Sequence, residues 1–267
     1  MSDLGTRERL EQSGVMPRVR IAAAGDVHAD ERTRPRIEEA FGRVGGEADI
    51  VLLAGDLTSH GRPEEAQVLA DAARGLNIPV IAVFGNHDWH ENRIPELQGI
   101  LEDAGITLLE RSSTVCEVQG TTLGVVGTKG FVGGFPGSTL PDFGEPLLRE
   151  VYAEAGRDVE ALELGLQEIE GCALRVVLLH YSPTMTTLVG EPESIWTMLG
   201  TNRLDGPIQK HKPDLVLHGH AHSGTFAGAI GGVPVYNVAV HVTRRDFFVF
   251  ELDSDAAHGE RLAAPAL

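Results

Sequence analysis

Short apolar runs that stop abruptly at polar residues recur along the chain. The five clearest runs read VRIAAAGDVH, DIVLLAGD, PVIAVFGNHD, LRVVLLH and DLVLHGHAH. Continuous Val, Ile, Leu and Ala bounded by glycine is typical of strands buried on both faces, as in sheets covered by helices. The stretches RPRIEEAFGRV and RPEEAQVLADAARG separate the first three runs and are amphipathic. This alternation of strands and helices predicts an α/β architecture.

A second group of apolar runs is more closely spaced. These runs read ITLLE, STVCEVQ, TTLGVVG, VPVYNVAV and DFFVFEL. Turn residues such as Gln119-Gly120 and Gly231-Gly232 separate several of them, which favours a second sheet with more antiparallel pairing. We therefore expect two facing mixed β-sheets flanked by helices, a four-layer α/β/β/α sandwich.

The patterned part of the chain runs from residue 18 to residue 252. A chain of 267 residues is long enough for one sizeable core, so we expect a single domain over 18–252. Residues 1–17 and 253–267 are polar or small and lack a periodic pattern. The sequence predicts a flexible N-terminal lead-in and a flexible C-terminal tail.

Composition and charge narrow the classes of partner. The formal net charge of -17 disfavours a long nucleic acid or an anionic membrane as partner, although bound divalent cations would reverse the sign locally. Cys116 and Cys172 are too few for a disulfide framework. There is no apolar signal segment and no apolar run of spanning length. We expect a cytoplasmic protein with a small-molecule partner, and self-association remains open.

Polar side chains follow five of the predicted strands. They are Asp26, His28, Asp56, Asn86, His180, His220 and His222. Ligands of open α/β sheets bind beyond the carboxyl ends of the strands, so these side chains should meet at one edge. Mixed imidazole and carboxylate groups suit Zn, Fe or Mn. This set is too large for one tetrahedral ion but suits two ions that share a carboxylate, an arrangement that orients a phosphoryl group and stabilises both oxygens of an in-line displacement.

These residues fall into five ordered motifs. The first three are D-x-H at Asp26–His28, G-D-x(4)-G at Gly55–Gly61 and G-N-H-D at Gly85–Asp88. The fourth is the single residue His180, and the fifth is G-H-x-H at Gly219–His222. From about residue 19 to 251 this order resembles the calcineurin-like metallophosphoesterase family. The resemblance implies a dinuclear phosphoesterase in which a hydroxide bridging two metal ions attacks the phosphorus. It also implies that one ion is held by Asp26, His28, Asp56 and His222, and the other by Asp56, Asn86, His180 and His220.

The resemblance also implies roles for the residues beside the ligands. His87 would face the phosphate or the leaving group as a proton donor or electrostatic stabiliser. Asp88 would hold the His87 imidazole in its working tautomer. Purple acid phosphatases carry a tyrosine where this chain has Ser59. This difference favours Mn or Fe(II), with Zn as an alternative, over a mixed-valence purple centre.

Two segments are candidate walls of the site. The Gly-rich stretch 127–146 is too apolar for an idle linker, and we expect it to cover the metal edge, with Lys129 as a phosphate contact. A structural Ω-loop is the alternative. In the segment after His180, Trp196 and Arg203 would stack on or pair with a nucleotide-like substrate. A dimer contact would use the same residue types.

Several further histidines lie outside the motifs. His60 and His90 are interpreted as loop residues that could instead orient substrate. His241 follows the run VPVYNVAV and could add an outer contact to the site. We favour a plain strand-end histidine for His241.

The resemblance favours hydrolysis of a small phosphodiester, such as a cyclic nucleotide, because family members with an uninterrupted motif set often accept diesters. The alternatives are a phosphomonoesterase, including a protein phosphatase, and a nuclease, which the acidic charge disfavours. A metal-free interaction scaffold is a fourth interpretation. None of the candidate ligands is substituted relative to the motifs. A site this dense in carboxylates and imidazoles is energetically costly without bound ions, which disfavours the scaffold.

Overall fold

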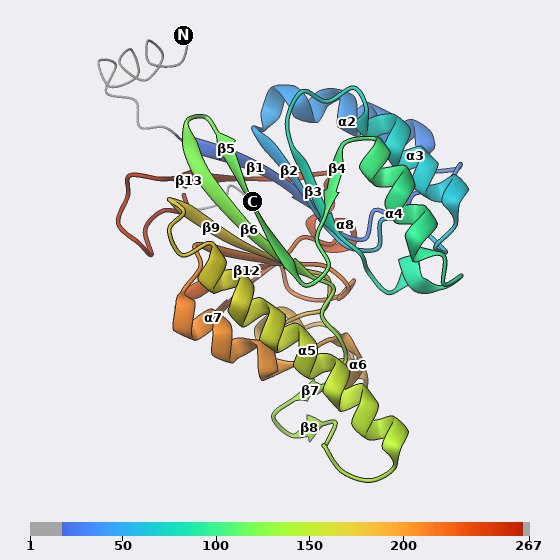
Figure 1. Ribbon diagram of the computed structural model, residues 1–267, viewed down its shortest axis with the longest axis vertical. Helices are drawn as coiled ribbons and strands as arrows, with labels where there is room; N and C mark the ends of the chain where they lie inside the picture. The colour runs from blue at the N-terminus through green and yellow to red at the C-terminus, as the bar shows by residue number, and fades with distance from the viewer. Residues whose placement is uncertain (1–17, 264–267) are drawn as a thin grey trace.

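The computed structural model describes residues 18–263, and its strands form two facing sheets with helices on their outer faces (Figure 1). The first sheet has the order β13-β1-β2-β3-β4. Its strands are β1 (Arg18–Ala24), β2 (Ile50–Ala54), β3 (Val80–Val83), β4 (Ile106–Leu108) and β13 (Phe248–Asp253). The expected sandwich of two helix-flanked sheets is confirmed. The lead-in predicted at 1–17 lies outside the described residues.

The second sheet has the order β11-β12-β10-β9-β6-β5. Its strands are β5 (Ser112–Val118), β6 (Thr121–Thr128), β9 (Leu174–Leu179), β10 (Leu215–His218), β11 (Ala227–Ile230) and β12 (Val233–Asn237). The inner strands β6, β9, β10 and β12 run parallel, and the edge strands β5 and β11 pair antiparallel. Only the edges therefore show the antiparallel pairing expected for this sheet.

Sheet membership differs from the sequence-based expectation in two places. The run at 106–108 becomes β4, which lies parallel to β3 in the first sheet. The run at 248–253 becomes β13 and pairs antiparallel with β1, with Ile21 opposite Phe250. The continuous apolar runs of β9 and β10 join the second sheet instead. An apolar run does not encode its partner, because partner choice depends on how the connecting segment crosses over.

Helices cover the outer face of each sheet (Figure 1). The first sheet is covered by α2 (Arg34–Glu47), α3 (Pro63–Ala73) and α4 (Ile94–Asp103), whose buried side chains pack on β1, β2 and β3. The second sheet is covered by α5 (Pro146–Glu168) and α7 (Asp205–His211). Each of α2, α3, α4 and α5 has proline in its first two positions, where a missing N–H removes no intrahelical bond.

The 23-residue helix α5 was not foreseen from the sequence, and neither was α4. The buried face of α5 includes Ala155, Asp158 and Gly165 beside only two leucines. Small residues and a carboxylate weaken the apolar stripe from which helices are recognised. The remaining short elements are α6 (Trp196–Leu199), α8 (Val240–Thr243), the 3-10 turns η1 (His87–Trp89), η2 (Met185–Thr187), η3 (Glu193–Ile195) and η4 (Asn202–Leu204), and the hairpin strands β7 (Gly134–Phe135) and β8 (Ser138–Thr139).

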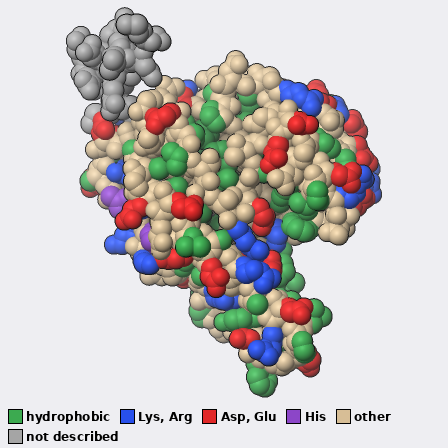
Figure 2. All heavy atoms as spheres, viewed as in Figure 1, with side chains coloured by type: hydrophobic (Ala, Val, Ile, Leu, Met, Phe, Trp, Pro, Cys, Tyr) green, Lys and Arg blue, Asp and Glu red, His purple; other side chains and the backbone are tan. Residues whose placement is uncertain are grey.

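The main core lies between the two sheets. Fully buried side chains such as Ile21, Leu52, Val125 and Val176 meet there, and Phe250 closes it at the β13 edge. Acidic and basic side chains are mixed over the face shown in Figure 2. The close-packed core between the two sheets holds the strand ends that carry the motif residues in fixed positions.

The segment after β13 is bound to the body of the protein. Asp253 N donates to Arg261 O and Ala263 N donates to Glu251 O, at 2.8 and 3.0 Å. Arg261 Nη1 lies 3.1 Å from Asp214 Oδ1. Residues 253–263 of the tail predicted at 253–267 therefore make defined contacts with the rest of the domain, and residues 264–267 lie outside the described residues.

Replacing Arg261 by alanine should loosen this segment. Asp214 is 5% exposed, and the substitution removes its guanidinium partner. We expect a loss of about 1–3 kcal/mol in unfolding free energy, measured by urea denaturation. Limited proteolysis should cut near residue 256 faster than in the parent protein. Unchanged proteolysis would show that the backbone pairing alone holds the segment.

Candidate metal centre

Four of the candidate ligands adopt a left-handed backbone conformation. The φ values are 57° at Asp26, 48° at His28, 49° at Asp56 and 69° at His220. Non-glycine residues rarely adopt this conformation, and it persists only where the surroundings enforce it. The turns aim consecutive polar side chains at the carboxyl edge of the sheets. Strain gathered on these residues is typical of a functional site.

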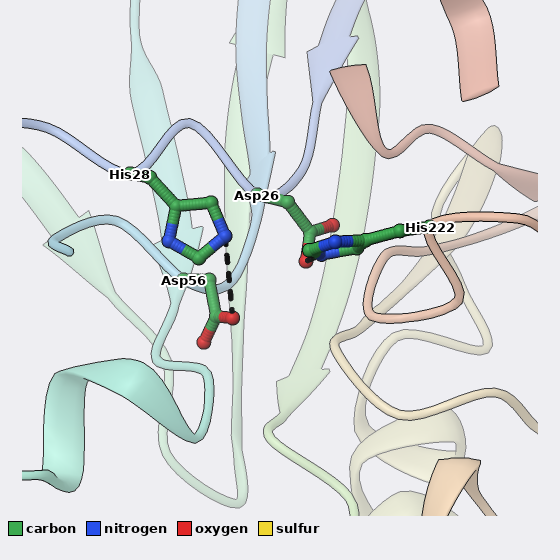
Figure 3. A group of neighbouring side chains, drawn as sticks. All are labelled: Asp26, His28, Asp56 and His222. Atoms are coloured by element: carbon green, nitrogen blue, oxygen red, sulfur yellow. Dashed lines mark hydrogen bonds and ion pairs between the residues drawn. The ribbon is translucent and has the colours of Figure 1, made fainter. Parts of the chain in front are cut away.

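The first group of side chains comes from three strand ends. Asp26, His28, Asp56 and His222 each offer an atom within 4.8 Å of the others, and their side chains converge in Figure 3. His222 Nε2 lies 2.8 Å from Asp26 Oδ1, and His28 Nε2 lies 3.8 Å from Asp56 Oδ2. The group offers two carboxylates and two imidazoles, a donor set that fits a divalent transition metal.

The second group shares Asp56 with the first. Asp56, His180 and His220 offer atoms within 4.8 Å of one another. His180 Nε2 lies 3.3 Å from Asp56 Oδ1 and 2.9 Å from Asn86 Oδ1, so Asn86 adjoins this group. His180 Nδ1 donates to Ala54 O, which leaves Nε2 as the atom facing the carboxylate. The structure brings together all seven residues expected as ligands, in two groups joined at Asp56.

Burial sets the charge states of this centre. It lowers the pKa of His28 to about 4 and lowers the pKa of His180 well below its usual value, so both imidazoles are neutral at pH 7. Neutral imidazole is the form that binds metals. Burial, followed by the charges of Asp26 and Asp88, raises the pKa of Asp56 to about 9. A cation between these groups would favour the ionised carboxylate, so the donor set fits two divalent ions.

Asp88 does not orient His87 as expected. Its carboxylate is fully buried and accepts hydrogen bonds from the backbone of Leu57, Thr58 and Gly85 and from Thr58 Oγ1. His87 Nδ1 instead donates to Ser59 O at 2.8 Å. The reason is the 3-10 turn η1, which directs Asp88 inward and His87 toward the edge. Asp88 therefore ties the loop of the shared ligand Asp56 to the loop of Asn86.

Gly85 provides the space that Asp56 occupies. A Cβ at residue 85 would overlap both Asp56 Oδ1 and the Asp56 backbone nitrogen. The close approach is what allows the strand ends of β2 and β3 to present Asp56 and Asn86 side by side.

The Gly85→Ala variant should consequently disturb both groups at once. We expect a stability loss of about 1–3 kcal/mol and a fall in metal content, measured by thermal denaturation and by elemental analysis of the purified protein. Gly99→Ala is the matched control, because no atom lies within 4 Å of a Cβ there. Normal metal content in Gly85→Ala would contradict the packing argument.

Lys129 lies beside the second group. Its carbonyl oxygen accepts from the backbone nitrogens of His180 and Tyr181. Its Nζ donates to Gly130 O and lies 4.5 Å from the centre of the Phe131 ring. The segment 127–146 forms the small hairpin of β7 and β8, and Gly133 and Gly134 bind the backbone at Thr197 and Gly200. A phosphate contact for Lys129 stays a prediction.

Trp196 and Arg203 both contact other parts of the protein. Trp196 packs against the small cluster of Phe135, Leu188, Leu199 and Ala221, and its Nε1 donates to Glu191 O. Arg203 donates from Nη1 to Tyr152 O and lies over the Tyr152 ring at 4.0 Å. Both side chains are partly buried against the protein. A contact of either one with a nucleotide-like substrate stays a prediction.

Two aromatic neighbours of the centre differ from the favoured sequence interpretation: Tyr181 was not singled out, and His241, interpreted as a plain strand-end histidine, makes the alternative outer contact. The Tyr181 ring lies 4.3 Å from the ring of His220. The His241 ring stacks on His222 at 4.1 Å with an interplanar angle of 11°. Tyr181 directly follows the motif residue His180, which is a usable signal. The position of His241 depends on how α8 returns to β1, which no local pattern reveals.

The chain is similar in sequence to known proteins. The calcineurin-like phosphoesterase family matches residues 19–224. Over 197 residues the chain is 28% identical to a Synechococcus sp. protein named "probable cyclic nucleotide phosphodiesterase", and the match covers 73% of this chain and 67% of that protein. None of the helices within residues 18–263 combines the length and apolarity needed to cross a membrane.

Solved structures confirm the fold. The protein TT1561 of Thermus thermophilus has a TM-score of 0.57 at 19% identity, and the match covers 89% of this chain and 95% of that one. Phosphopantetheinyl hydrolase from Mycobacterium tuberculosis has a TM-score of 0.62 at 16% identity, with 92% and 96% covered. The family match includes every residue of the two groups, and together with the fold it shows that the chain belongs to the calcineurin-like phosphoesterase family.

Proposed function

We propose that this phosphoesterase hydrolyses a small phosphodiester, with a cyclic nucleotide as the first substrate to test. The observation that carries the proposal is the pair of ligand groups joined at Asp56. The relative named as a cyclic nucleotide phosphodiesterase supports the choice of a diester. The formal charge of -17 disfavours a polyanionic substrate, which makes a small diester the better candidate.

The residues have distinct tasks in this proposal. Asp26, His28, Asp56 and His222 would hold one divalent ion, and Asp56, Asn86, His180 and His220 the other. Two such ions would supply the positive charge that activates a water molecule and stabilises the transition state of an in-line displacement. Mn or Fe suits these nitrogen and oxygen donors, and Zn is the alternative. Lys129 would add a positive charge beside the phosphoryl group.

His87 would assist the leaving group. Its Nδ1 is occupied by Ser59 O, so Nε2 is the atom available at the centre, 3.9 Å from Asp56 Oδ2. The side chain is 34% exposed, and therefore accessible to a substrate. In the imidazolium form, Nε2 would donate its proton to the departing alkoxide oxygen.

The His87→Ala variant tests this task through the leaving group. We expect kcat for a cyclic nucleotide to fall about 10²-fold, because an alkoxide leaves poorly without a proton. The fall for bis(p-nitrophenyl) phosphate should be much smaller, since p-nitrophenolate needs no acid. Metal content should match that of the parent protein. Equal losses on both substrates would contradict a proton-donor role.

The diester proposal is tested with bis(p-nitrophenyl) phosphate against p-nitrophenyl phosphate. The protein is stripped of metal, reloaded with Mn²⁺ and assayed on both, with Asp56→Ala as the inactive control. A higher kcat/KM for the diester, lost on stripping and in the variant, supports the proposal and leads to a screen of cyclic nucleotides. A preference for the monoester would replace it by a phosphomonoesterase function. Hydrolysis of neither compound by the two-metal protein would overturn the general diesterase proposal.

A further inference from the structure

One histidine outside the motifs contacts the first ligand group. The His241 ring lies parallel to the His222 ring at 4.1 Å, and it meets the His28 ring edge-on at 6.0 Å. Two expected ligands of one metal ion are thus covered by a single side chain that offers no ligand of its own to either group. This contact needs an explanation beyond that of a strand-end residue.

The backbone that carries His241 is fastened to the backbone that carries Asp26. Gly25 N donates to Val238 O at 2.9 Å, and Val240 N donates to Gly25 O at 3.0 Å. Gly25 immediately precedes Asp26, so these two backbone hydrogen bonds join the start of α8 to the first ligand turn. The ring of His241 is therefore held in a defined place relative to Asp26.

A second connection reaches the loop of His222. The buried Asn237 donates from Nδ2 to Ala221 O at 2.7 Å, and its Oδ1 accepts from Ala239 N at 3.2 Å. One amide thus links the residue before His222 to the residue before α8. The backbone hydrogen bonds of Gly25 and the side-chain hydrogen bonds of Asn237 therefore both hold the segment of His241 beside the first ligand group.

Within the first group, His222 has the most exposed side chain. Its side chain is 39% exposed, against 0% for Asp26 and 1% for Asp56. One edge of the ring is held by Asp26 Oδ1 at 2.8 Å, and the stacked ring of His241 covers one face. An imidazole that is already oriented loses less conformational entropy when it binds an ion.

We propose that His241 is a positioning residue that holds the His222 imidazole in place for the metal ion of the first group. The inference rests on the proposed two-metal function. It predicts a selective effect: the ion held by Asp26, His28, Asp56 and His222 should bind more weakly without His241, while the ion of the second group should bind as before.

The experiment compares His241→Ala with His241→Phe. Phenylalanine keeps a flat ring for stacking but has no nitrogen, so it separates positioning from a direct contact with substrate. His258→Ala is the control, because His258 is also an exposed histidine but pairs with Asp214, away from both groups. Mn²⁺ is titrated into each metal-free protein by calorimetry, and thermal denaturation checks that each variant is folded.

We expect His241→Ala to weaken one of two Mn²⁺ sites on the order of tenfold. His241→Phe and His258→Ala should keep both affinities within about threefold of the parent protein. Unchanged affinities in His241→Ala would overturn the inference and leave the proposed function intact. A raised KM in both variants at normal metal affinity would also overturn it, in favour of a substrate contact. No Mn²⁺ binding to the parent protein would overturn the proposed function and this inference together.

Discussion

Asp56→Asn is expected to lower kcat/KM for the best diester by at least about 10³-fold, equivalent to about 4 kcal/mol of transition-state stabilisation. Asp56 is the one side chain common to both ligand groups, and it is 1% exposed. An amide has the size of the carboxylate but lacks its charge, so the variant should lose both ions rather than one. Elemental analysis and steady-state kinetics measure the two effects.

The control for this variant is Asp71→Asn. Asp71 pairs with Arg34 and Arg74 on the surface of α3 and belongs to neither ligand group. The same change in chemistry should leave metal content and kinetics unaltered there. Asp56→Asn protein that retains two ions would show that the shared carboxylate is not required for binding, and would contradict the assignment of the centre.

Removal of the metal ions is expected to lower the melting temperature on the order of 10 °C. A ligand present at a thousand times its Kd stabilises the folded state by about 4 kcal/mol, and each kcal/mol is worth about 2–4 °C in a domain of this size. The centre buries the carboxyl groups of Asp26 and Asp56 at 1% exposure, and these groups lose their compensating positive charge when the ions leave. Thermal denaturation with and without a chelator measures the shift.

The metal-free protein should also become less stable as the pH rises from 7 to 9. Burial and the charge of Asp26 raise the pKa of Asp56 to about 9, above its value near 4 in the unfolded chain. The folded state therefore holds a proton that the unfolded state has lost, and stability falls with pH until that proton dissociates, by at most about 1.4 kcal/mol per pH unit. The pKa of His28 is lowered to about 4, so its contribution changes only below this window.

Asp56→Asn separates this effect from the other ionisable groups. The metal-free variant should show a smaller fall in stability between pH 7 and 9 than the metal-free parent, because the amide does not titrate. Urea denaturation at both pH values gives the comparison. If both metal-free proteins lose the same stability over this range, another group is responsible and the charge state assigned to Asp56 is wrong.

The sequence identified the candidate ligands without any structure. Strands that are buried on both faces must be almost wholly apolar, so polar residues such as Asp26, Asp56 and His180 stand out at their ends. The alternation of apolar runs and amphipathic stretches was sufficient to predict the layered α/β sandwich. Both signals are local in the chain and depend on the side-chain periodicity of single elements.

The sequence was less informative where the outcome depends on segments distant in the chain. The carboxylate of Asp88 turned out to bind backbone groups, and Arg203 turned out to bind α5. The same residue types in the same order would be compatible with either role. The deciding factor is the direction in which a turn or helix aims the side chain, and this direction is set by packing.

The amino-acid sequence by itself therefore determined the architecture class, the candidate ligand residues and the family that the chain resembles. The tertiary structure decided which strand lies in which sheet, that Asp88 binds backbone groups rather than His87, and that His241 stacks on His222. The physical reason is that apolar periodicity and motif spacing are properties of one segment. Strand partners and ring contacts arise only when separate segments pack together, as β1 does with β13 and His28 does with His241.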